Sequence, residues 1–134
     1  MNDLPVIRTR RDIEQIEQTP LAERDLPAST YELIQRTAQR HPQAPALSFL
    51  LQGQPGEPVY RLTYPQLLGK ITQTANAFHR LGLRPGKAVS FLLPNLPQTH
   101  FTIWGGEAAG IVNAINPLLD AEHIAELIHA SDSE

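Results

Sequence analysis

The sequence predicts an α/β fold in which an N-terminal β-hairpin precedes parallel strand–helix–strand layers. Amphipathic segments with helical spacing alternate with short apolar runs over residues 63–130, which is typical of parallel strands joined by helices. Before that alternation, two strand-like segments flank a stretch rich in glycine and proline, which favours a hairpin with a long loop. The length of 134 residues suits one modest domain.

Residues 1–28 are expected to form a peripheral leader that carries one short helix. Thr9 can cap this helix at its N-terminus, since its hydroxyl can accept a hydrogen bond from a free backbone N–H. Ile13 and Ile16 give the helix an apolar side, and Pro20 ends it. The leader therefore adds little to the expected core.

The first helix and the hairpin follow this leader. Ser29 starts a capping-box pattern, because Glu32 follows three positions later. This helix is expected to stop before Pro42, since the residue before a proline disfavours helical geometry. Residues 46–51 and 59–64 are predicted to be the two strands of the hairpin, and the residues between them its loop.

The helix predicted between Thr63 and Gly82 is the clearest amphipathic segment of the chain. Thr63 can cap its start, and Gly82 can close its end. Apolar side chains recur over about four turns at helical spacing. They are Leu67, Leu68, Ile71, Ala75, Phe78 and Leu81.

The parallel layer is predicted from strands at 88–93 and 111–115, joined by a helix at about 97–109. The first of these strands is short and largely apolar, as a strand buried on both faces would be. Glycines 105, 106 and 110 stand near the end of the connecting helix. Close backbone packing explains them better than phosphate binding, because phosphates bind at helix N-termini.

A last helix is expected to begin at Asp120 and to turn Ile124, Leu127 and Ile128 inward. A strand should follow a helix in such an alternation. The sheet is therefore expected to have an exposed edge, which folded proteins usually cover, and the chain to be a piece of something larger.

Composition excludes several classes of protein. Eleven basic and fourteen acidic residues give a net charge of −3, which leaves no electrostatic footprint for nucleic acid. Cysteine is absent, so disulfides, thiol catalysis and thiolate zinc sites are excluded, and a cytoplasmic location fits. No stretch reaches the ~18 apolar residues of a membrane span.

The candidate binding residues lie in the loops at the carboxyl ends of the two parallel strands, where open α/β sheets bind ligands. Asn95 and Asn116 offer polar groups there. Structural roles are the competing interpretation, with Asn95 as a helix N-cap and Asn116 as a turn residue before Pro117. No catalytic residue and no metal site is assigned. The motif His123, Glu126 and His129 is interpreted as a solvated helix face, since it lies opposite the apolar stripe.

Several motifs, taken in order, resemble the N-terminal part of AMP-forming acyl-CoA synthetases of the adenylate-forming superfamily. The strongest are Leu92-Leu-Pro-Asn-Leu-Pro97 and Trp104-Gly-Gly-Glu-Ala-Ala-Gly-Ile-Val-Asn-Ala-Ile-Asn-Pro117. Earlier segments such as Leu62-Thr-Tyr-Pro65 and Leu81-Gly-Leu-Arg-Pro-Gly86 extend the resemblance over residues 29–134. Residues 1–28 resemble the leader of a bacterial subgroup of these enzymes.

The resemblance implies that residues 29–134 are an incomplete N-terminal α/β subdomain of an AMP-binding enzyme. The family joins a small-molecule carboxylic acid, often fatty or aromatic, to coenzyme A through an acyl-adenylate made from ATP with magnesium. Its phosphate-binding loop, its ribose-binding aspartate and its C-terminal lysine have no counterpart in this sequence. The chain is therefore expected to be the scaffold part, inactive alone, without a cofactor of its own and partnered by the remainder of the synthetase.

Two further hypotheses remain open at this point. A truncated product could act as an interaction module through its open sheet edge. A small flavodoxin-like protein could instead bind a nucleotide with its strand-end loops, and calorimetric titration with ATP, AMP and flavin mononucleotide would detect such binding.

Overall fold

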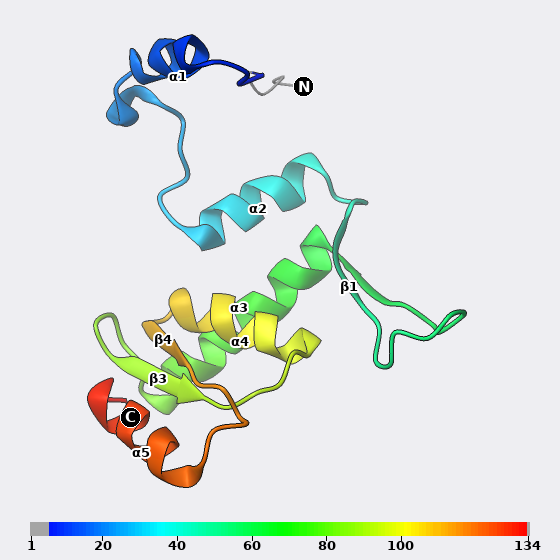
Figure 1. The fold of residues 1–134 in the computed structure, drawn as a ribbon, viewed down its shortest axis with the longest axis vertical. Helices are drawn as coiled ribbons and strands as arrows, with labels where there is room; N and C mark the ends of the chain where they lie inside the picture. Colours follow the sequence, from blue (N-terminus) through cyan, green and yellow to red (C-terminus); the bar gives the residue numbers. More distant parts are fainter. Residues whose placement is uncertain (1–5, 134) are drawn as a thin grey trace.

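The computed structural model describes residues 6–133 and confirms the predicted α/β class (Figure 1). One pair of strands is antiparallel and a second pair is parallel. In chain order the elements are α1 (Arg10–Glu17), the 3-10 helix η1 (Leu21–Glu23), α2 (Thr30–Arg40), β1 (Pro45–Phe49), β2 (Tyr60–Thr63), α3 (Tyr64–Leu81), β3 (Ala88–Phe91), α4 (Pro97–Glu107), β4 (Ile111–Ala114) and α5 (Ala121–Ala130).

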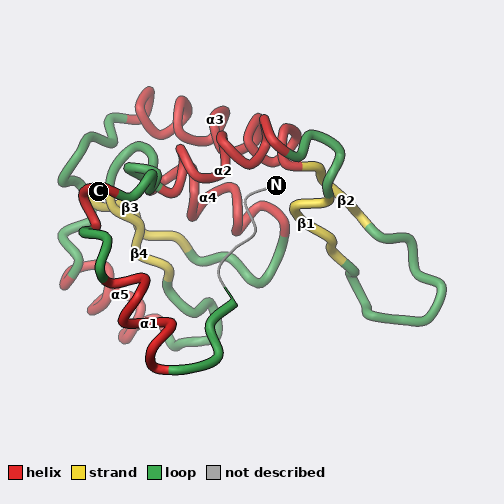
Figure 2. The backbone as a smooth tube through the Cα atoms, turned by 90° about the horizontal axis from the view of Figure 1, so that it is seen from above, coloured by secondary structure: helices red, strands yellow, loops and turns green. Residues whose placement is uncertain are grey.

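The core lies in the layer formed by α2, α3 and α4. Ile71 of α3 is fully buried, and Ile34 and Leu67 are buried beside it. Phe101 and Trp104 of α4 pack against this cluster. Figure 2 shows the three helices on one side of the β3–β4 pair and α5 on the other side. The parallel strands therefore stand between a packed helical layer and a single helix.

The leader helix α1 is capped as predicted, because the hydroxyl of Thr9 accepts a hydrogen bond from the backbone N–H of Asp12 at 3.4 Å. The backbone N–H of Thr9 donates in turn to the Asp12 carboxylate at 2.8 Å. Arg24 closes its far end by donating to the carbonyl oxygen of Ile16 at 2.7 Å. No residue of α1 is buried, and Figure 1 shows α1 and η1 apart from the other elements. Residues 1–5 of the predicted leader lie outside the described residues.

The hairpin is shorter than predicted, because β1 ends at Phe49 and pairs it with Tyr60. The carboxylate of Glu57 gives the reason. It accepts hydrogen bonds from the backbone N–H groups of Leu51 at 2.6 Å and Gln52 at 3.0 Å, which removes both from strand pairing. These backbone donors hold the pKa of Glu57 below its ordinary value.

The parallel pair β3–β4 runs in register from Ala88 opposite Ile111 to Phe91 opposite Ala114. The expectation of a strand buried on both faces is wrong for most of β3. Ala88 is buried, but the other three residues are only half-buried. The reason is the thin cover on the α5 side, where one short helix faces both strands (Figure 2). At Ser133 the chain returns to β3 and forms a parallel bridge with Ala88.

The prediction that glycines 105, 106 and 110 serve close packing is confirmed. A Cβ atom on Gly105 would lie 2.7 Å from the Cβ of Thr74 in α3. A Cβ atom on Gly106 would lie 2.3 Å from a methyl group of Val112 in β4. Real Cβ atoms avoid such distances, so these glycines let α4 approach both neighbours.

Two apolar positions predicted to face the core are exposed. Leu81 is 82% exposed because it is the last residue of α3, and Leu127 is 43% exposed although Ile124 and Ile128 beside it are half-buried. Helical spacing predicted which side of each helix is apolar, but it did not show which residues on that side have packing partners. Over the described residues, no helix has the length and apolarity needed to cross a membrane.

Candidate functional site

The carboxyl ends of β3 and β4 lie side by side, as the sequence predicted. Phe91 and Ala114 are partners at the end of the pair, and the N–H of Ile115 donates to the carbonyl oxygen of Phe91 at 3.1 Å. The two strand-end loops, residues 92–96 and 115–120, therefore leave the same edge of the sheet. This edge is the candidate ligand site of a parallel α/β layer.

Asn116 has the turn role that its place before Pro117 predicted. Its side-chain oxygen accepts a hydrogen bond from the N–H of Leu118 at 3.0 Å. Its carbonyl oxygen accepts one from the N–H of Leu119 at 3.3 Å. The side-chain oxygen of Asn116 is thus already engaged in holding the loop.

The predicted role of Asn95 as the N-cap of α4 is wrong, because the N-cap is Leu96. The hydroxyl of Thr99 replaces a capping side chain. It accepts a hydrogen bond from the N–H of Leu96 at 3.3 Å and donates one to the carbonyl oxygen of Pro94. Asn95 is exposed beside this arrangement. The missed signal is the threonine three positions after Leu96, which occupies the place of the second partner in a capping box.

The strand-end edge does not fit a magnesium–triphosphate group. Neither loop contains lysine or arginine. Within residues 6–133, no three His, Asp or Glu side chains come together as they would around a metal ion. Phosphate and magnesium binding needs cationic groups and oxygen ligands that converge on one point.

The histidines of α5 lie on an exposed face, as the sequence predicted. The N–H of His123 donates to Asp120 at 3.0 Å, and the ring Nδ1 of His123 lies 2.6 Å from the other carboxylate oxygen of Asp120. Asp120 is thus the N-cap of α5, as expected from the sequence. These backbone and side-chain contacts with His123 lower the pKa of Asp120 below its ordinary value.

A polar network joins the two parallel strands to the end of α5, and sequence reasoning missed it. Asn113 of β4 donates to the hydroxyl of Ser90 in β3 at 2.8 Å and to the hydroxyl of Ser131 at 3.0 Å. Ser90 also lies 2.7 Å from the hydroxyl of Ser133. Only a contact over 43 positions reveals its hydrogen-bonding role.

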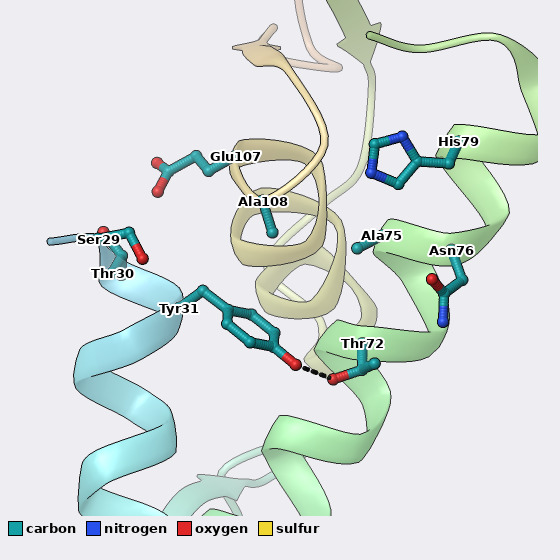
Figure 3. Close-up of a pocket in the computed structure, with 9 residues that line it drawn as sticks. All are labelled: Ser29, Thr30, Tyr31, Thr72, Ala75, Asn76, His79, Glu107 and Ala108. Carbon is teal, nitrogen blue, oxygen red and sulfur yellow. Dashed lines mark hydrogen bonds between the residues drawn. The ribbon is translucent and has the colours of Figure 1, made fainter. Parts of the chain in front are cut away.

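The opposite end of α4 borders a pocket of about 520 Å³ between α2, α3 and α4. Figure 3 shows Tyr31 reaching from α2 to α3, where its hydroxyl lies 2.7 Å from that of Thr72. His79 of α3 and Glu107 of α4 stand at the upper rim. No local sequence pattern indicates a role for either side chain, because their meeting depends on the packing of three helices.

Comparison with known proteins places these features in context. Residues 34–134 match the family described as AMP-binding enzyme. The chain is 33% identical over 122 residues to marinolic acid–CoA ligase of Pseudoalteromonas sp. (strain SANK 73390), which covers 91% of this chain and 19% of that protein. It is 31% identical over 100 residues to acetyl-coenzyme A synthetase of Phycomyces blakesleeanus, covering 75% of this chain and 14% of that protein.

The fold is also similar to a solved structure. The N-terminal subdomain of NpsA from Klebsiella oxytoca superposes with a TM-score of 0.67 at 17% identity, over 79% of this chain and 26% of that one. This likeness concerns the fold alone. In each comparison the chain spans only about a quarter of the matched protein or less.

Proposed function

Because this chain belongs to the AMP-binding enzyme family, we propose that it forms the N-terminal α/β scaffold of an AMP-forming acyl-CoA synthetase. Such an enzyme converts a carboxylic acid, ATP and coenzyme A into acyl-CoA, AMP and pyrophosphate. The observation that carries the proposal is the match to marinolic acid–CoA ligase, which runs over 91% of this chain but 19% of that ligase. Residues 29–134 are the subdomain in this proposal, and residues 1–28 are its leader.

The role of this scaffold is structural rather than catalytic. The strand-end edge supports this view, because the oxygen of Asn116 is engaged in a turn and neither loop carries a cationic side chain. ATP, magnesium, coenzyme A and the acid, a fatty acid in many members of such a family, are bound by the remainder of the synthetase. That remainder is the partner of this chain, and the absence of cysteine supports a cytoplasmic location.

Carboxylate-dependent exchange between pyrophosphate and ATP tests the catalytic half of the proposal. The purified 134-residue chain is expected to give no exchange above the blank with acetate, octanoate or benzoate. Phosphoryl chemistry needs positioned cations and metal around the phosphates, and these loops supply none. Exchange that depends on the acid and survives further purification would contradict the proposal.

A graft tests the scaffold half. The 122 matched residues of marinolic acid–CoA ligase are replaced by their counterparts from this chain. The chimera is expected to fold and to keep the acid preference of the parent ligase, because a scaffold does not contact the acid. A folded chimera with a changed acid preference would show that this region selects the substrate.

An interaction module is the second candidate function, and one surface favours it. Ile111 is 53% exposed and Leu118 is 90% exposed at the β4 edge and its loop. Exposed apolar side chains beside an open strand edge are typical of surfaces that another polypeptide covers. Concentration-dependent self-association in sedimentation would support this candidate, and a monodisperse monomer at high concentration would count against it.

A further inference from the structure

We propose that the pocket between α2, α3 and α4 binds a basic group, an ammonium or guanidinium ion carried on a short apolar stem. This site lies at the C-terminal end of α4, whereas the strand-end edge lies at its N-terminal end. It is therefore separate from the site considered above. Its volume of about 520 Å³ is ample for a basic side chain or a small amine.

The charge of the lining favours a cation. Glu107 is the one carboxylate among the described lining residues, and none of them is lysine or arginine. Glu107 is exposed, and no hydrogen bond or ion pair joins its carboxylate to another described residue. An anionic ligand would meet this carboxylate without a compensating positive side chain in the lining, so phosphates are disfavoured.

The end of α4 adds negative potential to the same place. Glu107 is the last residue of α4, Ala108 is its C-cap, and the last turn contains no basic residue. Free carbonyl groups give a helix C-terminus a partial negative charge, which cations stabilise. The neighbouring helix α3 shows the contrast, because Arg84 donates to the carbonyl oxygen of its His79 at 2.7 Å.

Ser29 caps the N-terminus of α2 at the pocket, and Glu32 places a carboxylate in the first turn of this helix. The hydroxyl of Ser29 accepts from the N–H of Glu32 at 3.1 Å. The carboxylate of Glu32 accepts from the N–H of Ala28 at 2.7 Å. The positive end of α2 therefore has its own negative side chain.

Hydrogen-bond directions leave acceptors turned toward the pocket. Thr72 donates its hydroxyl hydrogen to the carbonyl oxygen of Leu68 at 2.8 Å. Tyr31 must then donate to Thr72, which leaves the phenol oxygen of Tyr31 only its acceptor capacity. Nδ1 of His79 lies 3.2 Å from the carbonyl oxygen of Leu83, to which it can only donate, and in a neutral imidazole Nε2 would then be an acceptor.

The walls suit the apolar stem of such a ligand. Figure 3 shows the methyl groups of Ala75 and Ala108 and the ring of Tyr31 between the polar ends of the pocket. A methylene stem could pack on these groups while the charged end meets Glu107.

Calorimetric titration of the 134-residue chain tests the chemistry directly. The probes are propylguanidinium and butylammonium, with butyrate and butanol as anionic and neutral analogues of similar size. Both cations are expected to bind with one-to-one saturation and about tenfold tighter than butyrate. Binding of butyrate as tight as that of the cations, or no saturable binding of either cation, would overturn the proposal.

Three variants locate the bound cation. Glu107→Gln is expected to weaken cation binding about fivefold, because it removes a solvent-exposed charge without changing shape. Tyr31→Phe keeps the ring and removes the acceptor, so a loss of about threefold is expected. The matched control is Glu126→Gln on the exposed face of α5, which should leave the affinity unchanged. An equal loss in the control would overturn the proposal.

A blocked arginine, Nα-acetyl-arginine N-methylamide, distinguishes a basic side chain of a polypeptide from a free small amine or guanidine. Binding at least as tight as that of propylguanidinium supports a side chain presented by a polypeptide. Weaker binding of the blocked arginine supports a free small amine or guanidine, since the added main chain does not fit the mouth of the pocket. A thermal unfolding curve for each of the three variants checks that it is folded.

Discussion

On one side of the β3–β4 pair, α4 packs against α3 through glycines and buried apolar side chains. On the other side, hydrogen bonds from Asn113 and Ser90 hold the end of α5. The first contact contains the fully buried Ile71, whereas α5 has no buried residue. Van der Waals packing therefore closes one side, and oriented polar groups close the other.

The difference between the α3–α4 contact and the attachment of α5 indicates which substitutions each can tolerate. A glycine-mediated contact fails by steric overlap, because a rigid backbone cannot move away from an added methyl group. A polar attachment fails by loss of hydrogen bonds, and solvent can replace part of that loss. Damage to the first should destabilise the whole fold, and damage to the second should release α5 locally.

The largest expected effect comes from Gly105→Ala in the α3–α4 contact. The new Cβ would lie 2.7 Å from the Cβ of Thr74 and 2.9 Å from the carbonyl oxygen of Ile71. We expect the free energy of unfolding to fall by about 2 kcal/mol, measured by urea denaturation. The matched control is Gly69→Ala in α3, which has open space around it and should gain about 0.5–1 kcal/mol from helix propensity. Equal effects in the two variants would refute the steric interpretation.

The next effect comes from Asn113→Ala in the α5 attachment. The substitution removes the donor to Ser90 and Ser131, so we expect a loss of about 1–1.5 kcal/mol. Native-state hydrogen exchange is the measurement, and the amides of α5 should exchange faster while those of α3 keep their protection. Uniform acceleration in both helices would show that the polar network supports the global fold.

A smaller loss of stability is expected at the start of α4, where Thr99 and Asn95 can be compared. Thr99→Val removes the hydroxyl that serves Leu96 and Pro94, so a loss of about 1 kcal/mol is expected. Asn95→Ala should change the free energy of unfolding by less than about 0.5 kcal/mol, since Asn95 is exposed and is not the cap. A larger loss for Asn95→Ala than for Thr99→Val in denaturant titrations would indicate that Asn95 is the capping residue.

The smallest effect is a pH dependence at the N-terminus of α5. The pKa of Asp120 is lowered in the folded chain, chiefly by the N–H of His123. A lowered pKa means that its contribution is present above the unfolded value of about 3.9 and is lost as the pH falls through the folded pKa. As the pH falls below about 3.9, NMR signals of the first turn of α5 should therefore shift, and those of the α3–α4 contact should not shift with them.

Asp120→Asn is the control for this titration. Asparagine caps a helix about as well as aspartate but does not titrate, so the local shift in the first turn of α5 should disappear. Persistence of the same transition in this variant would assign it to another group.

Most of the fold could be predicted from local patterns. The capping pattern at Ser29 gave the start of α2, and the repeated apolar residues of α3 gave that helix within one residue at each end. The alternation of strands and helices gave the parallel pair. The candidate edge also followed, since Asn116 takes the turn that Asn-Pro predicts.

Other features could not be predicted because they depend on distant partners. Asn95 is not the cap of α4, because the hydroxyl of Thr99 accepts from the N–H of Leu96 and donates to the carbonyl oxygen of Pro94. The pocket near His79 and Glu107 needs three helices that are far apart in the sequence. The periodicity within one helix does not predict which other helices it will contact.

The sequence by itself determined the α/β class, the order of the elements and the family, because periodicity, caps and colinear motifs are local properties of the chain. Only the tertiary structure decided which polar groups meet. Ser90 and Ser133 are 43 positions apart, yet their hydroxyls lie 2.7 Å from each other. Hydrogen bonds and pockets depend on distances in space, and those distances are fixed by how the layers pack.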